Sequence, residues 1–104
     1  MSHVTIRLKD WSKLPNGRLR NDGPHSAEVF RDDVLAPALQ KNDSVTLDLN
    51  GVYGLASSWT EEVFGGLVRT HELTPEQILK KLDLSLNTDL RLAQIKEYIF
   101  ASRS

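Results

Sequence analysis

Two strand-like segments, separated by a stretch of helical length, place the strongest constraint on how this chain can fold. Val4, Ile6 and Leu8 alternate with polar residues, which is the period of a strand with one buried face. Residues 45–49 read VTLDL, a run of β-branched and apolar residues that predicts a second strand. Strands joined through a helix favour parallel pairing. We therefore expect an α/β fold in which helices pack on one or both faces of a small sheet.

Further patterns complete the predicted order β-β-α-β-α-α-β-α. The Asn16-Gly17 turn predicts that residues 18–20 return as a strand against the first one, which makes the sheet mixed. Helices are predicted over 27–39 with Ser26 as N-cap, after Ser57-Ser58, over 75–82 behind a Thr74 capping box, and up to residue 101. Pro37 is expected to kink or shorten the first of them. A short strand is predicted over 84–86.

Length and composition restrict the classes of function. The chain has 104 residues and a formal net charge of −1, so we expect one domain over residues 1–104 and no diffuse basic surface for nucleic acid. The absence of cysteine excludes disulfides, thiolate metal sites and cysteine catalysis. No apolar run is long enough for a membrane span, and the first ten residues lack a secretory pattern. A cytoplasmic location is expected.

Residues typical of catalytic or metal sites do not form a recognisable motif. The three histidines lie in separate segments without the spacing of metal ligands. Adjacent carboxylates such as Asp32-Asp33 and Glu61-Glu62 diverge by about 100° on a helix, and no GxSxG motif surrounds Ser57 or Ser58. Glycine-rich phosphate-binding motifs are absent as well. We therefore expect no enzyme activity, no metal and no cofactor.

The most informative segment, residues 47–59, runs from a strand through a glycine turn to two serines at the start of a helix. Unpaired N–H groups at a helix start favour an anion, so a phosphate on either serine would be tolerated there. The alternative is that Ser57 or Ser58 simply caps the helix, which is the commoner role of serine at this position.

The same segment carries a family resemblance. Residues 47–52 read LDLNGV and residues 56–59 read ASSW. This arrangement resembles the STAS domain of bacterial anti-sigma factor antagonists, in which a strand close to LDLSGV precedes DSSG at a helix start. The chain is most similar to the related STAS-like domains of unknown function. Further likeness to them comes from Gly17-Arg18, from Phe30-Arg31, and from Ser57-Ser58 followed by Glu62, Phe64 and Gly65. The resemblance implies a STAS-like fold.

The resemblance also implies a function. In the antagonists the second serine of DSSG is phosphorylated by a partner kinase, and that position is Ser58 here, with Ser57 before it; Ala56 and Trp59 replace the flanking aspartate and glycine. We therefore expect a signalling module that binds an ATP-binding histidine-kinase-like or anti-sigma-like protein. Phosphate at Ser58 is expected to lower binding through repulsion by Glu61 and Glu62. The expected partner-binding residues are Asn50, Gly51, Tyr53, Trp59, Thr60 and Glu61, with Thr60 and Glu61 exposed beside the serines.

Two other classes stay open. One is a nucleotide-sensing or small-ligand domain, in which Arg18, Arg20 and the helix start at Ser57-Ser58 recognise phosphate. The other is a structural interaction domain without a switch. The oligomeric state is not predicted.

Overall fold

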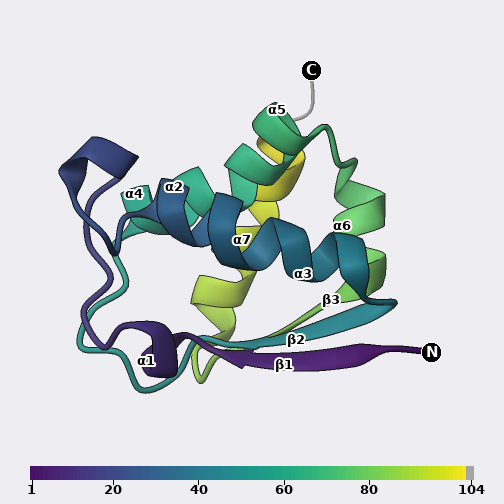
Figure 1. Ribbon diagram of the computed structural model, residues 1–104, viewed down its shortest axis with the longest axis horizontal. Coiled ribbons are helices and arrows are strands. Elements are labelled where there is room, and N and C mark those ends of the chain that lie inside the picture. The colour runs from purple at the N-terminus through teal and green to yellow at the C-terminus, as the bar shows by residue number, and fades with distance from the viewer. Residues whose placement is uncertain (103–104) are drawn as a thin grey trace.

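A three-stranded parallel sheet forms one layer of the structure, and the helices form the other (Figure 1). The computed structural model describes residues 1–102. The strands lie in the order β1 (His3–Arg7), β2 (Ser44–Asp48) and β3 (Leu82–Ser85). Their register places Val4 beside Val45 and Leu47 beside Leu84. Side chains of one face therefore turn toward the helices, and the other face is left to solvent.

Two long helices cover the sheet, and each contains a π-helical segment. The first consists of α2 (Ala27–Phe30), the π segment Arg31–Leu35 and α3 (Ala36–Lys41). The second consists of α4 (Ser57–Thr60), the π segment Glu61–Gly65 and α5 (Gly66–His71). We call them the 27–41 helix and the 57–71 helix.

The remaining helical elements are shorter or terminal. They are α1 (Leu8–Trp11), a 3-10 turn (Arg20–Asp22), α6 (Pro75–Lys81) and α7 (Asp89–Ala101). In Figure 1, α6 closes one end of the molecule, while α1 and the long loop that follows it lie at the other. Among the described residues, no helix has the length and apolarity needed to cross a membrane.

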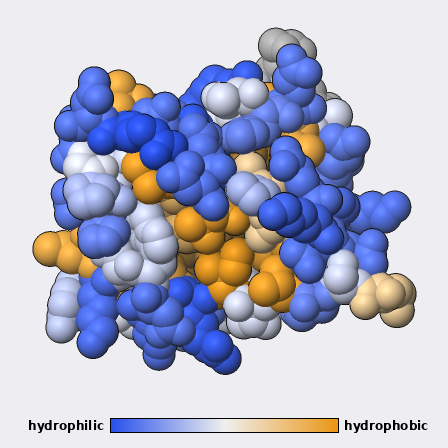
Figure 2. Space-filling view, in the orientation of Figure 1, coloured by the Kyte–Doolittle hydropathy of each residue, from blue (hydrophilic) through white to orange (hydrophobic). Residues whose placement is uncertain are grey.

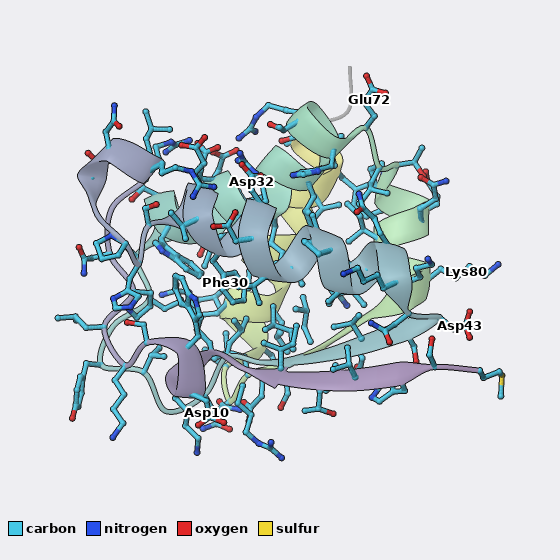
Figure 3. All side chains as sticks on the ribbon, in the orientation of Figure 1. Asp10, Phe30, Asp32, Asp43, Glu72 and Lys80 are labelled. Carbon is cyan, nitrogen blue, oxygen red and sulfur yellow. The ribbon has the colours of Figure 1, made fainter. Side chains whose placement is uncertain are left out.

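The core lies between the two layers. Val45 and Leu47 on the central strand are fully buried, whereas Val4 and Ile6 on the edge strand β1 are only half-buried. Figure 2 accordingly shows apolar surface in the middle of one face, between the 27–41 helix and β1, surrounded by hydrophilic residues. Phe30 points from its helix toward the sheet (Figure 3) and is fully buried.

The fold class expected from the sequence is confirmed: the chain is α/β, with helices packed on a small sheet. Two helix starts are also confirmed. Ser26 Oγ accepts a hydrogen bond from Val29 N at 3.3 Å, and Thr74 and Gln77 form a reciprocal capping box. The last strand covers 82–85 instead of 84–86.

The second strand predicted over residues 18–20 is wrong. The backbone of this segment is bound locally, because Asp22 Oδ2 accepts hydrogen bonds from the N–H groups of Arg18 and Leu19 at 3.1 and 2.9 Å. The carbonyls of Gly17 and Arg18 in turn accept from the first turn of the 27–41 helix. The strands are consequently all parallel instead of mixed, and the order loses its second β element.

Pro37 does not shorten its helix, which continues to Lys41. A proline has no N–H to donate to the carbonyl four residues earlier, and its ring crowds that carbonyl. The π segment lies directly before Pro37, where Ala36 N bonds to Arg31 O across five residues. This wider turn accommodates the proline within a continuous helix.

Candidate functional site

The loop of residues 49–56, between β2 and the 57–71 helix, is held at three points. At its start, the Asn50 side chain donates to Asp48 Oδ1 and accepts from the N–H of Asn87, both at 2.9 Å. In its middle, Tyr53 N donates to the Lys13 carbonyl at 2.7 Å. At its end, the Arg91 guanidinium donates to the Leu55 carbonyl. The loop is therefore a fixed platform.

Gly51 allows this loop to turn close to α1. Its φ of +87° lies in the left-handed region that favours glycine. A Cβ atom here would also lie 2.8 Å from Cδ of Lys9. The role of Asn50 and Gly51 as partner contacts stays a prediction, and the structure gives both residues a part in shaping the loop.

The platform presents an exposed aromatic ring. Tyr53 is 79% exposed, and Leu14, next to the carbonyl that holds its backbone, is 57% exposed. We call Leu14 together with the exposed residues of 51–58 the Tyr53 surface. Leu14 was missed by sequence reasoning, because a single apolar residue in a polar loop looks the same whether it is buried or exposed. Its place beside the loop follows from the hydrogen bond between the neighbouring Lys13 carbonyl and Tyr53 N, 40 positions apart along the chain.

Ser57 and Ser58 occupy the first two positions of the 57–71 helix, and both are exposed. The expectation that one of them caps the helix is wrong. The N-cap is Ala56, whose carbonyl accepts from Thr60 N at 3.1 Å, so the helix begins one residue earlier than a serine cap requires. Neither hydroxyl group therefore caps the helix, and both serines are exposed at its start.

Trp59 and Thr60 are buried, with 1% and 0% of their surface exposed. The expectation that Thr60 is exposed is therefore wrong. Trp59 packs against Phe30 with ring centroids 5.5 Å apart and donates from Nε1 to the His25 carbonyl at 3.2 Å. Thr60 Oγ1 donates to the Ser57 carbonyl at 3.0 Å. Because the indole ring points inward, it leaves the surface around Ser58 open.

The two glutamates that follow are neutralised by arginines. Glu61 pairs with Arg18 and, at 2.7 Å, with Arg69; Glu62 pairs with Arg18 at 2.9 Å and with Arg31 at 2.6 Å. The hydrogen bond from Arg69 lowers the pKa of Glu61, against the opposing effect of burial. Glu61 and Glu62 are therefore a weak source of repulsion for a phosphate at Ser58, which corrects the reasoning from sequence.

Arg31 connects the two long helices beneath this network. Its side chain is only 4% exposed, and its guanidinium contacts Asp32 Oδ1 at 2.8 Å and the Glu62 carboxylate at 2.6 Å. Burial disfavours the charged guanidinium, but the hydrogen bonds to Asp32 and Glu62 outweigh that effect and raise the pKa of Arg31. Burial likewise opposes ionisation of Asp32, and the bonds from Arg31 and His71 outweigh it and lower the pKa of Asp32. Figure 3 shows Asp32 on the side of its helix that faces away from the sheet.

The arginines proposed as phosphate ligands are separated by the fold. Arg18 binds carboxylates on the 57–71 helix, whereas Arg20 forms two 3.0 Å hydrogen bonds with Asp33 on the 27–41 helix. Across residues 1–102, no three His, Asp or Glu side chains lie together as a metal site.

Comparison with known proteins assigns the chain to a family. A model of the STAS-like domain of unknown function (DUF4325) matches residues 26–88. Comparisons with curated proteins and with solved structures find no match. The matched segment contains both long helices, β2, the loop of residues 49–56 and the two serines; Lys13, Leu14 and β1 lie outside it. Since the match spans more than half of the chain, this protein belongs to the family of STAS-like domains of unknown function.

Proposed function

We propose that this protein is a non-catalytic protein-interaction module that binds its partner through the Tyr53 surface. The observation that carries the proposal is the 79% exposed ring of Tyr53 on a loop held at three points. Tyrosine is enriched at the energetic centres of interfaces, and a pre-ordered loop loses little entropy on binding. An ordered, exposed tyrosine beside an exposed leucine is therefore suited to docking a protein.

The arrangement of polar groups favours binding over catalysis. Among the described residues, the hydroxyls of Ser57 and Ser58 have no hydrogen-bonded base. The pair of His71 and Asp32 involves the far end of the 57–71 helix, which is roughly 20 Å long at 1.5 Å per residue. Within the part of the chain that the structure describes, a nucleophile, a base and an orienting group do not come together.

Regulation through Ser58 belongs to the same proposal. A phosphate there adds a charge of about −1.5 to −2 at the exposed helix start, within the Tyr53 surface. The proposed partner is an ATP-binding histidine-kinase-like or anti-sigma-like protein in the cytoplasm, where ATP is available, and phosphorylation releases it. Ser58→Glu should weaken binding and Ser58→Ala should preserve it. If both variants bind like the wild type in titration calorimetry, the switch is wrong and the interaction module remains.

The contact surface itself is tested by quantitative capture from a lysate of the source organism. Wild type, Tyr53→Ala and the control Lys80→Ala are immobilised at equal density, and bound proteins are measured by mass spectrometry. Lys80 lies on α6 at the opposite end of the molecule and is exposed (Figure 3). A partner retained by the wild type and by Lys80→Ala but lost by Tyr53→Ala supports the proposal. Equal retention by all three contradicts it.

No observation favours nucleotide sensing as a second function. Arg18 and Arg20 are both paired with carboxylates, and they bind to different helices.

A further inference from the structure

Two lysines stand beside the Tyr53 surface without ionic partners. The Lys9 side chain passes over Gly51, as shown by the 2.8 Å approach between its Cδ and the position of a Cβ on that glycine. Lys13 supplies the carbonyl that binds Tyr53 N. Both lysines are exposed, and within residues 1–102 neither forms a salt bridge. They differ in this from Arg18, whose charge is matched by carboxylates.

The charged groups near Lys9 and Lys13 leave the edge of the Tyr53 surface, which we call its rim, with more positive than negative charge. Asp10 is the exposed acidic group of α1 (Figure 3). Asp48 at the start of the loop is half-buried, and its Oδ1 accepts the Asn50 backbone and side-chain N–H groups at 2.9 Å. Arg91 adds a further cation at the other end of the loop. Lys9, Lys13 and Arg91 thus outnumber Asp10 and Asp48 by one, so these groups carry a formal charge of +1, although the whole chain carries a net charge of −1.

We propose that the Tyr53 surface selects an acidic protein face, with Lys9 and Lys13 pairing with carboxylates around an apolar contact made by Tyr53 and Leu14. This inference rests on the proposed function and names the chemistry of the partner. An apolar centre with a charged rim is the usual anatomy of a specific interface, and opposite charges at the rim speed association and fix orientation. The exposed leucine and tyrosine favour a protein over a nucleic acid, because phosphate contacts would leave both apolar groups unused.

An acidic partner also explains how phosphate at Ser58 acts. Since Glu61 and Glu62 are paired with arginines, repulsion has to come from the partner's own carboxylates. A phosphate at the helix start places negative charge on the Tyr53 surface, beside which the two lysines lie. It therefore opposes the carboxylates that the lysines attract, and binding falls.

The test uses the partner isolated through Tyr53-dependent capture. Its affinity for the wild type, for Lys9→Glu/Lys13→Glu and for the control Lys41→Glu/Lys80→Glu is measured by calorimetry at two salt concentrations. Lys41 and Lys80 are exposed and lie on α3 and α6, so the control changes the net charge equally at sites away from the Tyr53 surface. Lys13→Glu alone guards against any disturbance of the contact between Lys9 and Gly51.

The expected result is a loss of roughly tenfold or more in affinity for the Lys9/Lys13 variant, with a smaller loss for Lys13→Glu and little change in the control. Salt should weaken the wild-type complex more than the complex of the Lys9/Lys13 variant. If the Lys9/Lys13 variant binds within twofold of the wild type, the acidic partner is wrong while the contact surface stands. If binding never depends on Tyr53, the contact surface itself is wrong. A captured ligand that is removed by nuclease also overturns the inference.

Discussion

Replacement of Gly66 by alanine tests whether Arg31 is locked between the two long helices. A Cβ on Gly66 would lie 2.9 Å from Cδ of Arg31 and closer still to Nη1. Arg31 has little room to move, because its side chain is 4% exposed and its guanidinium is bound by Asp32 and Glu62. Overpacking of this kind costs about 1–3 kcal/mol, and disturbing a buried ion pair costs more. The higher helix propensity of alanine over glycine offsets about 1 kcal/mol of this cost. We expect a net loss of about 1–3 kcal/mol.

The neighbouring Gly65 provides a matched control. Both glycines have right-handed helical backbones, with φ near −65°. A Cβ on Gly65 would meet the side-chain ends of Ser102, Arg69 and Glu61. Arg69 is 41% exposed, so its side chain can rotate into solvent and make room for the methyl group. Alanine also has a higher helix propensity than glycine, which favours the variant. Gly65→Ala should therefore change the free energy of unfolding by less than about 1 kcal/mol in either direction.

Urea unfolding followed by circular dichroism gives the free energies of unfolding for the wild type, Gly66→Ala, Gly65→Ala, Arg31→Met, and Gly66→Ala combined with Arg31→Met. Arg31→Met removes the guanidinium that the new methyl group would meet most closely, so the cost of Gly66→Ala should be smaller in that background. If Gly66→Ala is as stable as Gly65→Ala, or costs the same with and without Arg31, the account of a locked arginine is refuted.

Three further predictions concern the charges around the long helices and the loop. Because folding lowers the pKa of Asp32, its carboxylate stabilises the fold above the unfolded pKa of about 3.9, and this stabilisation is lost as the pH falls through the folded pKa. The free energy of unfolding of Asp32→Asn should therefore depend less on pH below about pH 5 than that of the wild type. Arg18→Ala removes a 45% exposed partner and should cost less than about 1 kcal/mol in denaturant unfolding. Arg31→Met should cost more, about 3–5 kcal/mol, because it removes the buried cation that Asp32 and Glu62 share. Arg91→Ala should speed amide hydrogen exchange in residues 49–56 with little change in β2, and equal exchange in both proteins would show that the loop does not need this anchor.

Sequence reasoning predicted those parts of the fold that depend on local patterns. The alternation at Val4 and Ile6 and the cap at Ser26 are set by neighbouring residues, so the strand and the helix start follow from them. Leu8, expected to continue the strand, is instead the first residue of α1. Residues 18–20 have the same local pattern as a hairpin strand. Their actual conformation depends on Asp22, which binds their backbone N–H groups and leaves none for a ladder. A turn motif alone does not show whether the backbone N–H groups that follow it bond to a neighbouring strand or to a nearby side chain.

The site was predicted in part. The segment of residues 47–59 was identified from its strand, turn and helix start, and the structure places Tyr53, Ser57 and Ser58 at the surface. The spacing of Trp59, Val63 and Phe64 predicts a shared apolar helix face, and all three are buried there. Because Trp59 packs beside Phe30, it has almost no exposed surface for the partner contact that was also expected of it. The lysines near the loop and the partners of Glu61 and Glu62 were missed. Apart from Arg69, which lies eight residues from Glu61 on the same helix, they come from segments more than 30 residues away, which only the folded chain brings together.

Site-specific photo-crosslinking tests directly whether the partner binds at the Tyr53 surface. A photoreactive phenylalanine analogue replaces Tyr53 in one protein and Lys80 in the other, and each is irradiated with the lysate or the isolated partner. The account predicts one dominant crosslinked protein from position 53, competed by unlabelled wild type, and none from position 80. The crosslinked peptide should carry acidic residues. Crosslinks of equal yield from both positions, or none from position 53 while the partner still binds, would contradict the claim that the Tyr53 surface is the binding site.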